Sequence, residues 1–129
     1  MKIAIDTNRY RDFCEGVART VDRFRAADQI VMPFPVLAAL RPGFACGTTA
    51  RRNEGVLNTF LNRPRIICQF ADEQTTFRFA RIFRQLREQG TPIPTNDIWI
   101  ASIVQQHNLM LYSTDGHFDH LPQLGRLQE

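Results

Sequence analysis

The sequence predicts an α/β fold with a mostly parallel central sheet, and two features of the chain support this prediction. Short apolar segments typical of buried strands alternate with longer segments that have helical periodicity. Strands that are separated by helices in this way usually pair in parallel. The expected strands are residues 2–5, 29–32, 65–68 and 109–112, and residues 125–128 are a candidate for a short last strand.

Capping residues and helix breakers indicate where the helices begin and end. The first two helices are expected at residues 7–14 and 17–27. Pro35 suits the start of a third helix, which Pro42 and Gly43 are expected to stop. The later helices are expected at 49–61 after a Thr48 or Thr49 cap, at 72–89 before Gly90, and at 97–107 after a Thr95 or Asn96 cap. The apolar residues expected to face inward from the 49–61 helix are Val56, Leu57, Phe60 and Leu61.

Length and charge place the chain among ordinary globular proteins with a basic surface. Its 129 residues predict one domain, 1–129, and the content of 43% hydrophobic and 22% charged residues fits a packed core. The net charge is +3, and Lys2 is the only lysine, so arginine carries nearly all the positive charge. Arginine side chains match phosphate oxygens, which makes nucleic acid a plausible partner. An arginine-rich surface that only faces solvent explains the same composition.

The cysteines argue against a disulfide framework. Cys14, Cys46 and Cys68 are odd in number and form no CxxC pair, which also disfavours a thiolate zinc site. A cytoplasmic location fits best. The sequence MKIAID contains no long apolar region, so neither a signal peptide nor a membrane span is expected.

Three aspartates are expected to meet at one edge of the sheet. Asp6 follows the first strand, Asp115 follows the fourth strand, and Asp97 lies in the first turn of a helix. Ligands of open α/β sheets bind at the carboxyl ends of the strands. Clustered carboxylates repel one another without a cation, and Mg²⁺ and Mn²⁺ prefer oxygen ligands. Such an ion can activate water and stabilise charge at a phosphoryl group. Neutral neighbours that could orient the carboxylates are Thr7, Asn8, Asn96 and Thr114.

Each of these residues also has a purely structural interpretation. Asp6 fits a helix cap, Asp97 fits a favourable charge at a helix N-terminus, and Asp115 with Gly116 fits a turn. The combination is more specific than any single member. His117 and His120 do not match a standard zinc-ligand spacing, and loop residues or RNA contacts are the favoured interpretation of both.

The sequence resembles the PIN-domain VapC toxins over essentially its whole length. The segments that carry this resemblance are IDTNRY, PFPVLAALRPGF and TPIPTNDIWIASIVQQHNLMLYSTDGHFDHLPQL, in this order. The resemblance implies an α/β/α sandwich and an endoribonuclease that depends on Mg²⁺ or Mn²⁺ and cuts structured RNA such as tRNA or ribosomal RNA. It also implies a homodimer and a cognate VapB-like antitoxin whose C-terminal segment occupies the active-site groove.

The resemblance assigns roles to individual residues. Asp6 matches the first acidic ligand of the family, Asp97 the third and Asp115 the fourth. Asp119 matches an additional acid that some members have, and Thr114 matches the small hydroxyl residue before the fourth acid.

The chain departs from the family at the second acidic position. Ala39, in LAALRPGF, stands where the family usually has glutamate, and Glu54 on a later helix is not an obvious substitute. Two explanations are open, a naturally degenerate homologue and a deliberately inactivated variant. The intact surroundings of Ala39 favour a single replacement, and an engineered one over a natural one.

Two hypotheses for function follow, together with candidate contact residues. The first is metal-assisted RNA hydrolysis, with Arg41, Arg51 and Arg52 holding phosphates or else facing solvent or antitoxin. The second is a catalytically inactive module that binds RNA or an antitoxin. A phosphoryl-accepting receiver domain is disfavoured, because the chain lacks paired acids after its first strand and a late lysine. Trp99 is expected in the core rather than in an RNA groove, and Phe13 is a candidate for antitoxin contact.

Overall fold

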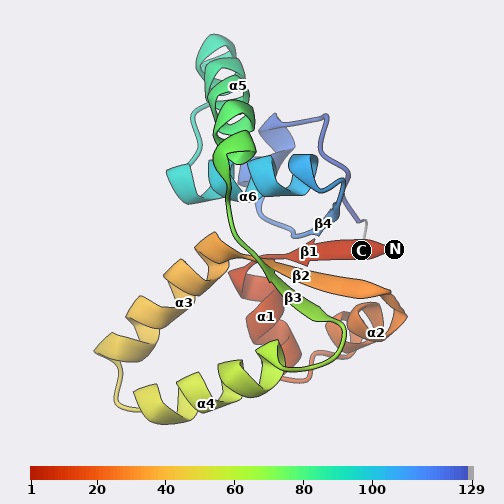
Figure 1. The fold of residues 1–129 in the computed structure, drawn as a ribbon, viewed down its shortest axis with the longest axis vertical. Helices are drawn as coiled ribbons and strands as arrows, with labels where there is room; N and C mark the ends of the chain where they lie inside the picture. Colours follow the sequence, from red (N-terminus) through yellow and green to blue (C-terminus); the bar gives the residue numbers. More distant parts are fainter. Residues whose placement is uncertain (128–129) are drawn as a thin grey trace.

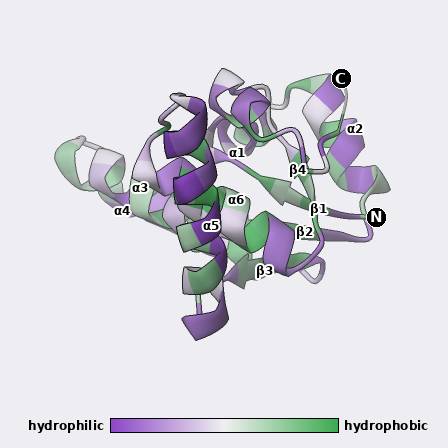
Figure 2. Cartoon of the chain, turned by 90° about the horizontal axis from the view of Figure 1, so that it is seen from above, coloured by the Kyte–Doolittle hydropathy of each residue, from purple (hydrophilic) through white to green (hydrophobic). Residues whose placement is uncertain are grey.

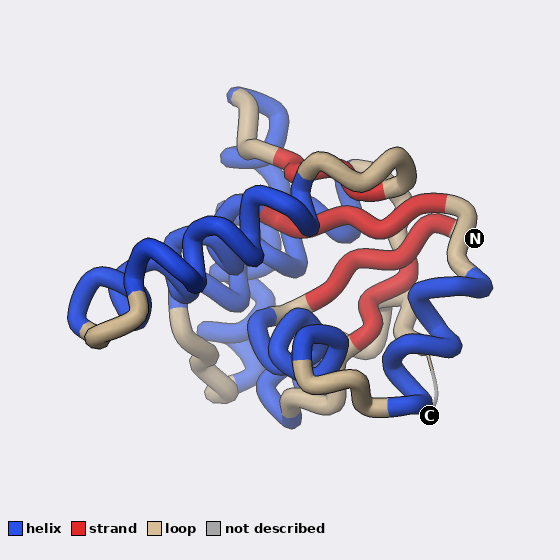
Figure 3. Tube along the Cα trace, turned by 90° about the horizontal axis from the view of Figure 1, so that it is seen from below, coloured by secondary structure: helices blue, strands red, loops and turns tan. Residues whose placement is uncertain are grey.

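The computed structural model describes residues 1–127, which form a parallel sheet with helices on both faces. The described strands are β1 (Lys2–Ile5), β2 (Gln29–Pro33), β3 (Ile66–Gln69) and β4 (Met110–Tyr112), in the order β3-β2-β1-β4. Every pairing is parallel. The strands run side by side through the centre of the molecule (Figure 3). The predicted fold class is therefore confirmed.

The strand order determines which face each helix covers. The chain steps from β1 to β2 to β3 in one direction and then returns across the sheet to β4. Right-handed crossovers in opposite directions place their helices on opposite faces. Accordingly α1 (Thr7–Cys14), α2 (Ala18–Ala26) and α4 (Ala50–Leu61) lie on one side of the sheet, and α5 (Glu73–Gln89) and α6 (Thr95–Gln106) lie on the other (Figure 1).

The third helix is longer than the sequence indicates. α3 extends over Phe34–Cys46 and continues through Pro42 and Gly43, so the prediction that these residues end it was wrong. A proline inside a helix removes one backbone hydrogen bond but does not prevent packing of the flanking turns. Leu40 before Pro42 is buried, and Phe44 after it packs against the core, so tertiary contacts hold the helix across the break.

Other helix ends match the sequence prediction closely, with one correction at a helix end and one on a helix face. Asp72 caps α5 through a capping box with Thr75, and Gly90 ends it in the left-handed conformation at φ 70°. Pro94, not Thr95 or Asn96, is the N-cap of α6. Val56 is 47% exposed on α4 and does not face inward, whereas Leu57 and Phe60 are buried.

The core lies on both faces of the sheet. β1 and β2 are buried over nearly their whole length, as expected for central parallel strands, while the edge strand β3 is only partly covered. Hydrophobic residues concentrate along the strands, and hydrophilic ones on the outer helix faces (Figure 2).

Arg126 forms an isolated parallel bridge with Leu111 in place of the expected last strand, and Gln128 lies outside the described residues. Among residues 1–127, no helix combines the length and apolar character that crossing a membrane requires.

Candidate metal centre at the carboxyl edge of the sheet

The acidic residues gather where β1 and β4 end side by side. The connections leaving β1 and entering β4 lie on opposite faces of the sheet, which makes this edge a topological switch point. Asp6 directly follows β1, and Asp115 is the third residue after β4. Asp97 approaches from the first turn of α6. The crossover pattern therefore brings these three acids, far apart in the sequence, to one place.

Asp6 is a helix cap and a member of this acidic group at the same time. Its side chain is buried, and Oδ1 accepts a hydrogen bond from the backbone N–H of Arg9 at 2.9 Å. Oδ2 accepts a hydrogen bond from the Ser113 hydroxyl at 2.5 Å. The helix cap and the hydroxyl fix the carboxylate from two sides, so the structural and functional interpretations of Asp6 are compatible.

Ser113 links Asp6 to Asp115, a role that no motif in the sequence indicates. Its hydroxyl oxygen also accepts a hydrogen bond from the backbone N–H of Asp115 at 3.1 Å. Ser113 is buried, while the neighbouring Thr114 is exposed. Successive side chains leave an extended backbone in opposite directions, so only one hydroxyl of the pair can face the site. The orienting role predicted for Thr114 falls in the structure to Ser113.

Asp97, Asp115 and His117 form a compact group of metal-binding side chains. Each offers one ligand atom, and these atoms all lie within 4.8 Å of one another. His117 Nδ1 lies 2.8 Å from Asp97 Oδ2 and 3.2 Å from Asp115 Oδ1. The three side chains are partly accessible, with exposed fractions of 16%, 32% and 46% in the order given. Carboxylate oxygens with one imidazole nitrogen are a donor set that fits a divalent cation.

The surroundings of Asp97 disfavour its ionised form. Burial raises the pKa of Asp97, and the nearby carboxylates of Asp115 and Asp6 raise it further. The hydrogen bond from His117 opposes this effect without cancelling it. A carboxylate that is costly to ionise beside other carboxylates gains from a bound cation.

The remaining predicted residues lie around this group. Asp119 is 69% exposed and pairs with Arg126, and it is outside the three-residue cluster. Arg126 also donates to the carbonyl oxygen of Ser113 at 2.7 Å, so it holds the loop after β4. The other polar neighbours proposed for orientation are exposed or partly exposed near the ends of their elements: Thr7, Asn8 and Asn96.

Ala39 lies on an exposed position of α3, between the buried Leu37 and Leu40. A larger side chain at Ala39 therefore meets solvent rather than the packed core. Arg41 forms an ion pair with Glu54 of α4 at 2.9 Å, which occupies both side chains. This contact agrees with the expectation that Glu54 does not replace the missing acid.

The candidate contact residues Arg51, Arg52 and Phe13 lie in a different part of the molecule from Trp99. Arg51 and Arg52 are exposed on α4, and Arg52 lines a groove together with Phe13. Trp99 is partly buried within a series of aromatic contacts, with its ring centroid 4.4 Å from that of Phe79 and 6.0 Å from that of Phe34. Trp99 is therefore a packing residue, as expected from the sequence.

Comparison with known proteins agrees with this fold. No protein-family model matches the chain. A curated relative, Ribonuclease VapC1 of Methanocaldococcus jannaschii, is 31% identical over 83 residues, which cover 64% of this chain and 60% of that protein. The alignment thus spans less than two thirds of the relative's length.

Solved structures match nearly the whole chain. VapBC-1 from nontypeable Haemophilus influenzae superposes with a TM-score of 0.88 at 22% identity, over 99% of this chain and 98% of that one. VapC20 of Mycobacterium tuberculosis, described as a sarcin–ricin loop cleaving toxin, has a TM-score of 0.72 at 11% identity, over 98% and 99% of the two chains.

The fold is the one seen in these VapBC toxin structures, which agrees with the resemblance to PIN-domain VapC toxins that the sequence motifs indicate. A curated protein to which this chain is similar in sequence is Ribonuclease VapC1.

Proposed function

We propose that this chain is a metal-dependent endoribonuclease of the VapC type, held in check by a VapB-like antitoxin and acting in the cytoplasm. The observation that carries the proposal is the convergence of Asp6, Asp97 and Asp115 at the switch point of a fold shared with VapC structures. The similarity to a protein named ribonuclease VapC1 supports the same activity.

The chain's own residues have separable tasks in this proposal. Asp97 and Asp115 would hold Mg²⁺ or Mn²⁺, since their oxygens are close together and partly accessible. Such an ion supplies an activated water and neutralises charge on the phosphodiester. Asp6, fixed by the Arg9 N–H and by Ser113, keeps a negative charge beside these ligands and orients Asp115 through the shared serine.

Ala39 makes this chain a weakened form of the enzyme in our proposal. Three acids of a four-acid site still gather at the edge, but α3 contributes none from position 39. The test is cleavage of a structured RNA in Mn²⁺ or in EDTA by the chain and by Ala39→Glu. We expect at least about a tenfold gain for Ala39→Glu, since one oriented charge at a metal site is worth about that much.

Matched variants make this test decisive. Asp97→Asn or Asp115→Asn in the Ala39→Glu background should abolish the gain, whereas Asp119→Asn should retain it because Asp119 lies outside the cluster. Absence of metal-dependent cleavage in a folded Ala39→Glu protein would contradict the nuclease proposal. RNA binding without turnover would then favour the second candidate function, an inactive module that binds RNA or antitoxin.

Structured RNA is the proposed substrate class. The support is the structural similarity to VapC20, which is described as cleaving the sarcin–ricin loop. Arg51 and Arg52 are exposed on α4 and available to phosphates, whereas Arg41 is paired with Glu54. Weaker RNA binding by Arg51→Ala than by Arg84→Ala, an exposed arginine on α5, is the expected result.

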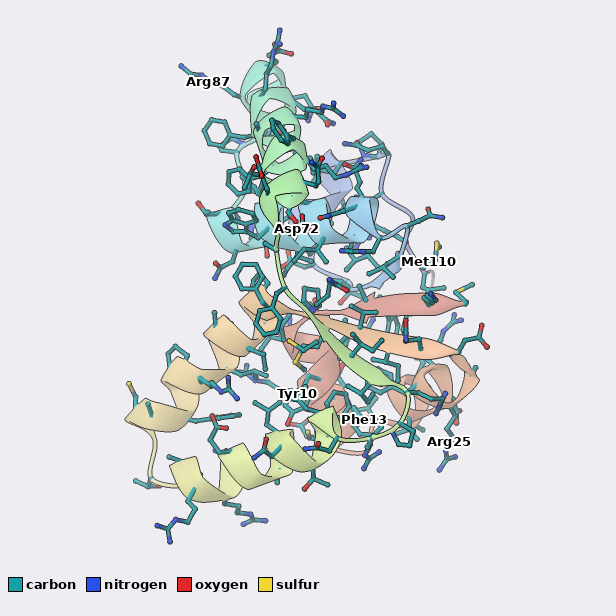
Figure 4. The ribbon with its side chains drawn as sticks, in the orientation of Figure 1. Tyr10, Phe13, Arg25, Asp72, Arg87 and Met110 are labelled. Carbon is teal, nitrogen blue, oxygen red and sulfur yellow. The ribbon has the colours of Figure 1, made fainter. Side chains whose placement is uncertain are left out.

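A groove on the opposite side from α5 is the proposed antitoxin contact. It has a volume of about 770 Å³ and an apolar floor that includes Phe13, Phe24 and Phe60. Arg25, Arg52, Arg63 and Arg65 line it. Phe13 belongs to α1 and Arg25 to α2, and both are labelled in Figure 4. An amphipathic antitoxin segment with acidic residues matches this combination of apolar floor and positive rim.

A homodimer is also part of the proposal. Phe77 and Phe83 on α5 are 55% and 49% exposed, which leaves two large apolar side chains on the surface of an outer helix. Exposed large apolar side chains can mark a protein contact. Sedimentation of the purified chain should therefore give a dimer, and Phe77→Ser with Phe83→Ser should give a monomer.

A further inference from the structure

The histidine of the cluster occupies the space between two carboxylates. His117 Nδ1 faces Asp97 Oδ2 at 2.8 Å and Asp115 Oδ1 at 3.2 Å. The sequence spacing gave no reason to treat His117 as a ligand, because its partners come from α6 and from the loop after β4. Only the folded chain brings this nitrogen to the acidic group.

The backbone around His117 holds the ring in this place. His117 is the second residue of the short 3-10 helix η1 (Gly116–His120), whose N-cap is Asp115. The His117 backbone N–H donates to Asp115 Oδ1 at 2.9 Å. The next residue, Phe118, is 1% exposed and anchors the turn in the core. His117 lies between the N-cap Asp115 and the buried Phe118, so it has little freedom to move away from the site.

We propose that His117 is a nitrogen ligand of the divalent cation at this site and tunes its metal preference. This inference rests on the proposed function only in so far as the site binds a cation. Nδ1 is the ring atom that faces both carboxylates, so it is the atom that would bind the ion. His117 thereby supplies a donor in a site from which the acid at position 39 is missing.

The chemistry of the donor set predicts which divalent cation binds more tightly. Mg²⁺ prefers oxygen ligands and water, while imidazole nitrogen favours first-row transition ions. A site with Asp97, Asp115 and His117 should therefore prefer Mn²⁺ over Mg²⁺ more strongly than a site built from carboxylates alone. His117 is 46% exposed, so an ion can reach the ring without a change in the fold.

The direct test is pulsed electron paramagnetic resonance of Mn²⁺ bound to the full chain without RNA. The chain has three histidines, His107, His117 and His120, so selective ¹⁵N-histidine labelling gives a readable signal. We expect a nitrogen coupling that changes frequency on ¹⁵N labelling. The coupling should vanish in His117→Ala and remain in His120→Ala and His107→Ala, which change exposed residues outside the cluster.

Calorimetry supplies an independent measurement of the same claim. His117→Ala should weaken Mn²⁺ binding about tenfold and Mg²⁺ binding much less. Absence of Mn²⁺ binding, absence of a histidine coupling in the unsubstituted chain, or a coupling that persists in His117→Ala would each overturn the proposal. Cleavage of RNA with no nitrogen coupling would remove this inference alone, whereas nitrogen coupling without cleavage would remove only the nuclease activity.

Discussion

Ser113 is the residue through which two strands share one site. Its hydroxyl donates to the buried Asp6 carboxylate and accepts from the Asp115 N–H. Ser113→Ala leaves a buried charged oxygen without this partner, which costs about 1–3 kcal/mol of unfolding free energy. Urea denaturation in EDTA measures this change. Thr114→Ala, at the exposed neighbour, should stay within about 0.5 kcal/mol, and equal losses for both variants would contradict the role of Ser113.

Asp97 is expected to destabilise the metal-free protein when it is ionised. Its pKa in the folded chain is raised above the ordinary carboxyl value, chiefly by burial. Unfolding therefore favours ionisation of Asp97. The resulting loss of stability of the folded protein is complete above the pKa of Asp97 in the folded chain, and it is absent below the ordinary carboxyl pKa. Asp97→Asn should raise the melting temperature at neutral pH in EDTA, and the gain should disappear as the pH falls through the carboxyl range. A gain that does not change with pH would contradict this electrostatic origin.

The identities of the acids were predictable from the sequence, but their partners were not. Asp6 and Asp115 follow strands, and the strand ends of a parallel sheet share an edge, so their proximity followed from the pattern. The contacts of Ser113 and His117 depend on which strands are neighbours and on how a short 3-10 turn is aimed. No repeating pattern of residues in the sequence reveals the strand order or the direction of this turn.

Among the helices, α3 contains a proline that destabilises it, and packing against the core compensates for this loss. Pro42 lies inside the helix, where it removes a backbone hydrogen bond. Pro42→Ala should therefore stabilise the protein, by about 1–3 kcal/mol in urea denaturation. Gly43→Ala, at a position with open space around it, should give a smaller gain of up to about 1 kcal/mol. A Pro42→Ala protein no more stable than the original would show that α3 does not gain from an unbroken helix.

Local signals predicted those helix ends at which a side chain caps the backbone. The Asp72 capping box and Gly90 mark both ends of α5, and Asp6 marks the start of α1. They fail at the C-terminal end of α3, which continues through Pro42 and Gly43, and at the start of α6, whose N-cap Pro94 makes no side-chain cap bond. Packing against the sheet determines these helices, and packing depends on the whole fold.

For the molecule as a whole, we propose that the two faces of the sheet bind different partners, an antitoxin at the groove of α1, α2 and α4 and a second copy of the chain at α5. The groove between α1, α2 and α4 is apolar with an arginine rim, and it lies away from α5. Arg52→Glu or Arg63→Glu should weaken binding of a VapB-like antitoxin about tenfold, or about 1.4 kcal/mol. Arg84→Glu, on α5, is the matched control. Equal effects of all three changes would contradict a docking site in this groove.

The architecture as a whole was predictable because the alternation of strands and helices leaves few topologies. Four short apolar strands separated by helices predict a parallel sheet, and the handedness of the crossovers then limits how the helices are placed. The strand order is what creates the switch point between β1 and β4. The exposure of Phe77 and Phe83 on α5 was not predictable in the same way, because helical periodicity alone does not separate core from contact surface.

The most direct test of the account is anomalous diffraction at the manganese edge from crystals of the chain and of Ala39→Glu soaked in Mn²⁺. The account predicts a peak contacted by the carboxylates of Asp97 and Asp115 in both proteins, with higher occupancy in Ala39→Glu. Crystals saturated with Mn²⁺ that show no peak at this edge, or a peak only elsewhere on the surface, would contradict a metal centre built from these acids.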